Sequence, residues 1–408
     1  MPQLPLVRWA ALFWGLAAFF PIGLNYAAFL GLALAMACQG GWPERGARLR
    51  RTPNWWPAWL FVGWTALVLA FGPTYPETSS NALHALRIVL TLALALALSR
   101  DEAVWALRGF CLGLAASLAL VVLNETVGLP PGAAWDSIVR YGGNKSLANA
   151  ALMALAAGTG LLLMPVLSGR QRLCAAVLSL GALGVLAWVL HSRTAWLILL
   201  ACGVAGLLHQ LRARRQEQVL AVALAAALTL GTGLLVPGVK DRVALGLHEI
   251  ASAYEGHAVD PGSSWGIRFR MYSETAAMVR EQPLWGWGIG GWSAQWKQRV
   301  EPALADSNMP HNDFLWMGAQ AGLPGAALLL WLVAAGLPAA WRRHDLSGRL
   351  GVVALLTMLV AVATNSALRD AAIGLSLWFI VLVYQRLSTE PEAVWLQALP
   401  GGRPADPA

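Results

Sequence analysis

The chain has 408 residues, of which 57% are hydrophobic and only 12% are charged. A soluble core cannot bury this much apolar surface, so the composition excludes an ordinary soluble domain and predicts an all-α, polytopic membrane protein. The formal net charge of +8 does not indicate nucleic-acid binding, because most basic residues lie in short clusters between apolar runs, where they set membrane topology.

Apolar runs recur along the chain, and a transmembrane helix needs about 20 residues, or fewer when it is tilted or paired. The sequence predicts about twelve spans, at residues 6–20, 24–38, 55–71, 83–98, 103–123, 147–167, 173–190, 195–208, 219–236, 314–337, 350–364 and 371–387. The first run has no signal-peptide cleavage site and is predicted to be retained as a membrane helix. Only residues 21–23 separate the first two runs, both of which are short.

Basic residues between the runs predict the orientation, because cytoplasmic loops are enriched in lysine and arginine. With the amino terminus inside, the inner loops carry Arg45, Arg48, Arg50, Arg51, Arg100, Arg170, Arg172, Arg212, Arg214, Arg215, Arg342, Arg343 and Arg349. The short outer loops carry Arg140, Lys145, Arg193 and Arg369. This bias predicts that both termini are cytoplasmic.

The outer segment 237–310 is much longer than the other connections, and segments of this length are usually functional or disordered. Residues 267–281 fit an amphipathic helix, and the aromatic-rich stretch LWGWGIGGWSAQW that follows argues against disorder. Trp285 and Trp287 fit either a membrane-interface belt or a face that stacks sugar rings or lipid. The predicted divisions are helices in 1–236, a partly helical outer loop at 237–310, further helices in 311–387 and a cytoplasmic tail at 388–408.

Several polar side chains lie at the predicted outer face, where ionisable groups beside a membrane are functional candidates. Arg193 occupies a short outer turn, and Arg268 begins the amphipathic helix, with Tyr272 one turn later. Both arginines also fit the alternative of interface anchors. Arg87 lies deeper in its span, so we expect it to pair with a backbone carbonyl or to face the same cavity.

Polar residues also begin the apolar run after Met309, in the sequence PHND. Pro310 fits the first turn of a helix, so His311 is predicted to lie in that turn, where the helix dipole favours neutral imidazole. Neutral imidazole can accept a proton, and the free N–H groups of a helix start suit a phosphate. The alternative is a structural histidine beside the helix caps Asn312 and Asp313.

Small residues follow along the same helix. Gly318 and Gly322 form a GxxxG pair, and Gly325 continues the small face. This pattern predicts close packing against a neighbour. Such packing would fix the height of His311.

Motifs of metal and nucleotide chemistry are missing from the sequence. The outer loops contain no DxD, no HExxH and no cluster of His with carboxylates, and the chain has no P-loop. The four cysteines lack the spacing of a zinc site or a disulfide framework. The sequence therefore predicts no metal and no cofactor.

An outer mouth with one base and several arginines suits a substrate that carries its own leaving group. A lipid-linked pyrophosphoryl sugar is such a substrate. The arginines would steady the departing pyrophosphate while the histidine takes the proton of an attacking sugar hydroxyl.

Three stretches resemble the O-antigen ligase and polymerase superfamily. HNDFLWMGAQAGLPG looks like the family signature, through His311, Asn312, Gly322 and Gly325. RTAWL resembles the Arg-x-x-x-Leu motif of the ligases, with Arg193 and Leu197. GIRFRMYSETAAMVREQPLWGWGIGGW is similar to the segment that precedes the signature, with Arg268 and the run Pro283, Leu284, Gly286, Gly288 and Gly290.

The resemblance implies a metal-independent inverting glycosyltransferase of the bacterial inner membrane with a GT-C-like helical fold. Such enzymes transfer O-antigen from undecaprenyl pyrophosphate to a sugar of lipid A-core on the periplasmic side, in lipopolysaccharide biosynthesis. By this likeness His311 is the catalytic residue, and Arg193 and Arg268 bind pyrophosphate. One departure is Gln320, which stands where family members often carry Glu.

Three alternatives stay open. An O-antigen polymerase would share the donor but elongate a second lipid-linked glycan. A protein O-oligosaccharyltransferase often has an added periplasmic domain after the last helix, where this chain has a short tail. A transporter or flippase of lipid-linked sugars would place polar groups near the bilayer midplane on broken, repeated helices.

Overall fold

The computed structural model describes residues 5–140, 142–212, 214–219, 237–255 and 263–398, and within these residues the regular structure is helical. The α-helices are α1 (Leu6–Ala17), α2 (Ile22–Gln39), α3 (Trp42–Arg50), α4 (Trp55–Phe71), α5 (Thr78–Leu96), α6 (Arg100–Val127), α7 (Asp136–Val139), α8 (Gly143–Leu163), α9 (Gly169–Trp188), α10 (Arg193–Gln210), α12 (Pro237–Tyr254), α13 (Ser264–Glu281), α14 (Gly291–Arg299), α15 (Asp313–Ala334), α16 (Leu337–Arg342), α17 (Leu346–Thr364), α18 (Ala371–Ile373), α19 (Phe379–Leu387) and α20 (Ala393–Ala398). Short turns complete them: η1 (Met164–Val166), η2 (Pro302–Leu304) and the π-helical η3 (Gly374–Trp378).

The apolar helices confirm the predicted membrane class. Within the described residues, eight helices are long and apolar enough to cross a bilayer, and α1, α4 and the α18–α19 unit are shorter apolar helices. Each predicted span other than 219–236 overlaps one of these helices. The exception lies, from residue 220 onward, outside the described residues. The chain is a multi-pass membrane protein.

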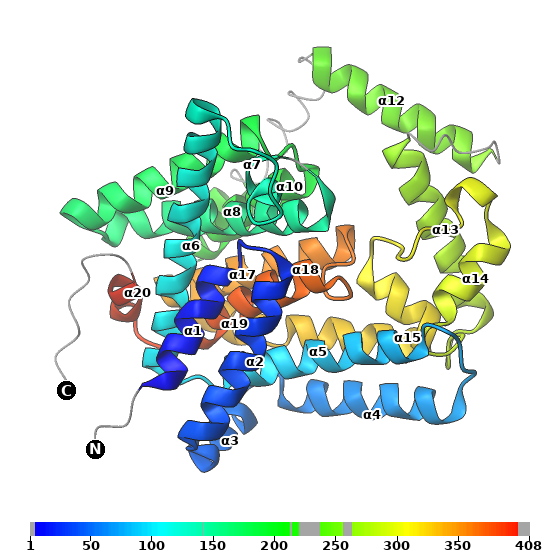
Figure 1. The fold of residues 1–408 in the computed structure, drawn as a ribbon, viewed down its shortest axis with the longest axis horizontal. Helices are drawn as coiled ribbons and strands as arrows, with labels where there is room; N and C mark the ends of the chain where they lie inside the picture. The colour runs from blue at the N-terminus through cyan, green and yellow to red at the C-terminus, as the bar shows by residue number, and fades with distance from the viewer. Residues whose placement is uncertain (1–4, 141, 213, 220–236, 256–262, 399–408) are drawn as a thin grey trace.

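Helices from distant parts of the sequence lie side by side. In Figure 1, α4, α5 and α15 run alongside one another, and α13 and α14 gather near one end of this group. The predicted amphipathic helix is present as α13, and the segment 237–310 is partly helical through α12, α13 and α14.

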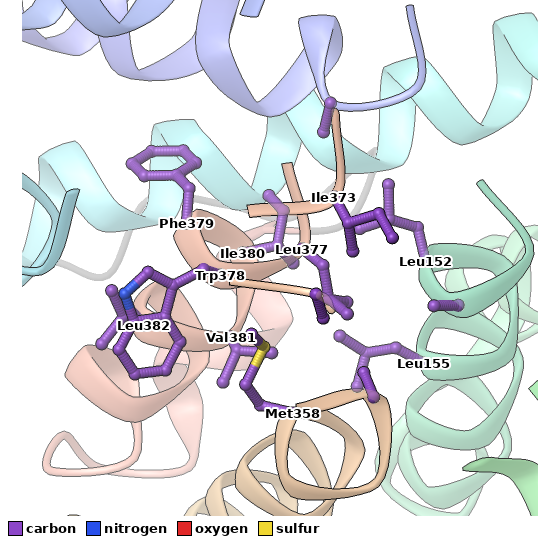
Figure 2. Close-up of a cluster of buried hydrophobic side chains, with 14 of the residues drawn as sticks. Leu152, Leu155, Met358, Ile373, Leu377, Trp378, Phe379, Ile380, Val381 and Leu382 are labelled. Carbon is purple, nitrogen blue, oxygen red and sulfur yellow. The ribbon is translucent and has the colours of Figure 1, made fainter. Parts of the chain in front are cut away.

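The core lies where α8 and α17 meet the C-terminal helices. Figure 2 shows Leu152 and Leu155 of α8 beside Met358 of α17, facing the apolar side chains of η3 and α19. Trp14 of α1 stacks on Phe379 with ring centroids 3.9 Å apart. These contacts are dense and apolar, so they hold the nearby helix ends in fixed positions.

Polar caps begin three helices at the end of the molecule that carries the predicted site. Ser192 accepts a hydrogen bond from the N–H of Ala195, and Asn312 accepts one from the N–H of Leu315. Asp370 accepts from the N–H groups of Ala372 and Ile373. Each cap neighbours a basic residue in the chain: Arg193 follows Ser192, His311 precedes Asn312, and Arg369 precedes Asp370.

Candidate active site

His311 precedes its helix instead of lying in the first turn. Helix α15 begins at Asp313 with Asn312 as its N-cap, so the prediction that Pro310 and His311 lie in its first turn is wrong. The physical reason is the cap: the side chain of Asn312 supplies the acceptor for the free N–H of Leu315 at 3.0 Å, which fixes the helix start at Asp313, three residues after Pro310. His311 has φ of +54°, a left-handed conformation that is uncommon for a residue other than glycine.

Contacts from two other elements hold this segment. The hydroxyl of Tyr272 on α13 donates to the backbone carbonyl of His311 at 3.1 Å. The side-chain amide of Asn312 donates to the carbonyl of Ala363 near the end of α17 at 3.0 Å. A strained residue persists only when its surroundings determine it, and such residues cluster at functional sites.

Helix α13 also brings Arg268 to this end of α17. The cap of α13 is Ser263, which accepts from the N–H of Gly266 at 2.9 Å. Arg268, one turn before Tyr272, donates to Oδ1 of Asn365 at 3.5 Å. The amide group of Asn365 donates to the hydroxyl of Thr194 at 3.0 Å. Asn365 therefore links the start of α10 to α13.

Arg193 lies at this junction, exposed at the first position of α10. Its guanidinium stacks over the ring of Trp265, 5.7 Å from the centroid. Trp265 is three residues before Arg268 on α13. Arg193 and Arg268 are 75 positions apart in the sequence, and the structure brings both to this junction. Arg193 is the one that is exposed to solvent.

The connection between α17 and α18 adds a buried carboxylate and a further arginine. Asp313 is fully buried and accepts from the N–H of Leu368 at 2.7 Å and of Arg369 at 3.1 Å. Its role is therefore to bind this loop and not to cap its own helix. Arg87, on α5, donates to the carbonyls of the same two residues at 2.9 and 2.6 Å. The expected pairing of Arg87 with a carbonyl is present.

Electrostatics favour the neutral form of His311. Burial, together with the positive charges of Arg268 and Arg369, lowers the pKa of its imidazole to about 4, against the opposing effect of Asp370. Burial also lowers the pKa of Arg369, while it raises the pKa of the Tyr272 hydroxyl. His311 is therefore a neutral base surrounded by arginines, a state that suits an anionic ligand.

The stretch from Pro283 to Gly290 packs into a break in α15. Ala321 and Gly322 have non-helical backbone angles, and Gly322 has φ of +70°. The freed groups bond to this stretch: the N–H of Leu323 donates to the carbonyl of Pro283 at 2.7 Å, and the N–H of Gly288 donates to the carbonyl of Gln320 at 3.0 Å. Of the GxxxG pair, Gly322 therefore packs on loop backbone, whereas a Cβ on Gly318 would lie 3.1 Å from the side chain of Val279 on α13.

Glycines make this approach possible. A Cβ atom on Gly322 would lie 2.2 Å from the carbonyl oxygen of Leu284, and one on Gly286 would lie 2.5 Å from the carbonyl carbon of Gln320. The side chain of Gln320 accepts from the N–H of Gly290. Gln320 thus joins this contact, in the position where the resemblance leads one to expect Glu.

The two tryptophans of the stretch have different surroundings. Trp287 donates from its indole to the carbonyl of Met278 at 3.0 Å and lies under the guanidinium of Arg299. Trp285 is exposed and stacks on Trp64 with centroids 5.2 Å apart. Trp285 is therefore the one with a face available for a sugar or lipid.

Sequence reasoning overlooked Asn365 and the part played by Arg369. The sequence marks Arg369 only as one of the few basic residues of the outer loops. Asn365 had no sequence signal, since its neighbours belong to the start of α10 and to α13. Arg268 and Arg369 act on His311 because contacts between residues far apart in the chain bring them close to it.

Metal ligands are not grouped in the part of the chain that the structure describes. No set of three or more His, Cys, Asp or Glu residues is placed there to hold an ion. The four cysteines, Cys38, Cys111, Cys174 and Cys202, are free thiols.

The fold and the site define a helical, multi-pass membrane protein with a histidine and arginines gathered at one end of its bundle. A family model described as O-antigen ligase matches residues 176–330, a stretch shorter than half of the chain that contains Arg193, Arg268 and His311. This match supports membership of the O-antigen ligase and polymerase superfamily, and its range contains the three motifs. No curated protein matches the sequence.

Proposed function

We propose that this protein is an O-antigen ligase that transfers O-antigen polysaccharide from undecaprenyl pyrophosphate to a sugar hydroxyl of lipid A-core. The reaction is an inverting glycosyl transfer that needs no metal and no cofactor. The enzyme lies in the bacterial inner membrane, with both termini in the cytoplasm. The segment 237–310 and the site face the periplasm, and the tail 388–408 is cytoplasmic.

The observation that carries this proposal is a neutral, strained histidine among arginines at one helix end. In the reaction, an acceptor hydroxyl oxygen bonds to the anomeric carbon of the donor as the bond to pyrophosphate breaks. His311 takes the hydroxyl proton, while Arg193 and Arg268 stabilise the departing pyrophosphate by charge-assisted hydrogen bonds. Asn312 and Tyr272 hold the histidine segment, and Arg87 holds the loop that presents Arg369.

The donor itself would improve the base. An imidazole with a pKa of about 4 is neutral at pH 7 but weak, and general bases work best when their pKa lies near the operating pH. The pyrophosphate would offset the arginine charges that lower this pKa, so donor binding would raise it. Proton transfer would then be favoured only in the complex with donor.

Two alternatives within the superfamily differ in the acceptor. An O-antigen polymerase would use the same donor contacts and a second lipid-linked glycan, and a protein O-oligosaccharyltransferase would use a hydroxyl of a protein. The family match does not distinguish these acceptors. We favour the ligase because the Arg193 motif resembles the ligases.

The alternative from another class is a transporter of lipid-linked sugars. Transporters often bind substrate where a helix is broken, and α15 is broken at Ala321 and Gly322. The carbonyl of Ala321 instead accepts the indole N–H of Trp64 at 2.8 Å, and the loop backbone fills the remaining break. These contacts favour a structural role for the break in α15 and argue against a transport site there.

The test is transfer in a purified, detergent-solubilised system with undecaprenyl pyrophosphate O-antigen, lipid A-core and excess EDTA. We expect transfer by the wild type and a loss of about 10²–10⁴-fold in His311→Ala, the usual contribution of a general base. Arg193→Ala should also be impaired, and His344→Ala, a histidine between α16 and α17, serves as the control.

Other results would redirect the proposal. Elongation of the donor glycan without transfer to lipid A-core would indicate a polymerase. Full activity in His311→Ala would make this residue structural, and a strict need for Mg²⁺ would contradict metal independence.

A further inference from the structure

A cavity with several charged lining residues lies at the other end of the helices that carry the candidate active site. It has a volume of about 330 Å³. Its lining includes Arg48 and Arg51 from the region of α3, Gln385 and Arg386 from α19, and Glu390 just beyond α19. Four of its twelve lining residues are therefore charged, three of them positively.

The direction of the helices places this cavity at the opposite membrane surface. Helix α15 starts beside His311 and leads to Gly336 in the cavity wall. Helix α5 runs from Thr78, which is bonded to Ile289 in the stretch from Pro283 to Gly290, to Leu96 in the same wall. Twenty-two residues of helix span roughly 33 Å, close to the thickness of a bilayer core. The arginine bias assigns this end to the cytoplasm under the proposed topology.

The arginines leave positive charge available to a ligand. Arg386 is paired with Glu390 at 2.7 Å, and Arg48 uses its Nε to donate to the carbonyl of Ala97 at 3.1 Å. Burial and the nearby charges of Arg45 and Arg386 lower the pKa of Arg48, although Glu102 opposes them. Arg51 is exposed at the cavity rim. One negative charge faces three positive ones, so an anion would relieve their repulsion.

An apolar groove begins beside the cavity. It has a volume of about 260 Å³ and lies between α4 and α5, with Leu49, Trp55 and Ala93 among its lining residues. Leu49 follows Arg48 in the chain, and Trp55 lies two residues after Pro53 of the cavity wall. A charged cavity that borders an apolar groove matches the two parts of a lipid, the head group and an acyl chain.

We propose that this cavity binds the head group of an anionic glycerophospholipid from the inner leaflet, with its phosphodiester on Arg48 and Arg51 and an acyl chain in the α4–α5 groove. The net positive lining favours an anionic lipid over a zwitterionic one. Phosphatidylglycerol is the anionic glycerophospholipid with which the site is tested. This site is separate from the proposed active site, and its occupancy does not depend on which acceptor sugar the enzyme uses.

The test is native mass spectrometry of the purified full chain, titrated with dioleoyl phosphatidylglycerol or dioleoyl phosphatidylethanolamine. We expect the wild type to retain phosphatidylglycerol preferentially. Because each basic residue near an anionic lipid contributes about 1 kcal/mol, Arg51→Gln should weaken binding roughly fivefold and the pair Arg48→Gln with Arg51→Gln roughly thirtyfold.

The matched control is Arg50→Gln, which removes the same charge from the same helix but does not line the cavity. Equal loss in Arg50→Gln would show non-specific charge attraction and overturn the proposal. Equal retention of phosphatidylethanolamine would overturn the anionic preference, and displacement by inorganic phosphate at equal concentration would indicate a soluble-anion site. Arg51→Gln alone keeps the bond of Arg48 to Ala97, so its result stands even if the double variant misfolds.

Discussion

His311 combines backbone strain with a depressed pKa, and both properties come from its neighbours. Its positive φ costs on the order of 1–2 kcal/mol for a residue other than glycine. The cap at Asn312 and the bond from Tyr272 hold this conformation. Burial and the charges of Arg268 and Arg369 keep the ring neutral. The proposed base is thus prepared before the donor arrives.

This depressed pKa makes a prediction about pH. Because the base must be neutral, kcat/KM should fall only as the pH drops through about 4, not through the ordinary value near 6.5. Arg369→Gln removes a charge that lowers this pKa, so it should move the acid limb to higher pH. Initial rates of transfer between pH 3.5 and 8 measure the acid limb of the wild type and that of Arg369→Gln.

The control for this pH profile is Lys297→Gln, which removes an exposed charge from α14. It should leave the acid limb in place. An unshifted limb in Arg369→Gln would show that Arg369 does not act on the proton-accepting group.

At the scale of elements, the break in α15 is the feature that joins the outer segment to the bundle. A continuous helix would satisfy its own backbone, whereas here the loop from Pro283 to Gly290 supplies the missing partners. The same loop is anchored to α5, because the hydroxyl of Thr78 donates to the carbonyl of Ile289 at 2.8 Å. The break therefore ties α5, α15 and the outer segment together.

Gly322→Ala should damage this junction. The substitution places a Cβ at a positive φ and 2.2 Å from the carbonyl oxygen of Leu284. We expect a loss of stability of about 2–4 kcal/mol from backbone strain and overpacking together. Thermal unfolding in detergent measures it.

Gly31→Ala is the matched control, since a Cβ there meets nothing within 4 Å. It should leave the melting temperature unchanged or slightly higher, because alanine has the better helix propensity. Similar melting temperatures for wild type and Gly322→Ala would mean that the loop can shift away from α15 without cost.

At the scale of the whole molecule, the helical bundle separates two groups of charged and polar side chains, one at each end. The arginine-rich end carries the cavity with Arg48 and Arg386, and the other end carries His311 and Arg268. The positive-inside bias and the proposed periplasmic chemistry require the same orientation. Topology is therefore a test of the whole proposal.

Cysteine labelling in intact cells should reveal this orientation. A cysteine introduced as Asp306→Cys, exposed in the segment 237–310, should react with a membrane-impermeant maleimide. Arg50→Cys, exposed at the end of α3, should react only after the membrane is opened. The parent chain gives the background from its own exposed Cys38. The reverse pattern of labelling would place the candidate site in the cytoplasm.

The sequence by itself determined the helical membrane class and the positions of the apolar helices within the described residues, and its motifs resemble those of the O-antigen ligase and polymerase superfamily. These properties depend on the length of apolar runs and on short motifs, which are local. The sequence also predicted that Asn312 could cap a helix, because a cap is read from neighbouring positions.

Only the tertiary structure decided the position of His311 before α15, the partners of the break at Gly322 and the place of Arg369 beside the histidine. Each depends on contacts between residues far apart in the chain, such as Tyr272 with His311 and Asp313 with Leu368. Local propensity favours Pro310 in a first helical turn, a preference that the long-range contacts outweigh. Pro324 favours a break in α15 locally, but the groups that the break frees find their partners only in the packed loop. The site therefore forms only when α10, α13, α15 and α17 meet.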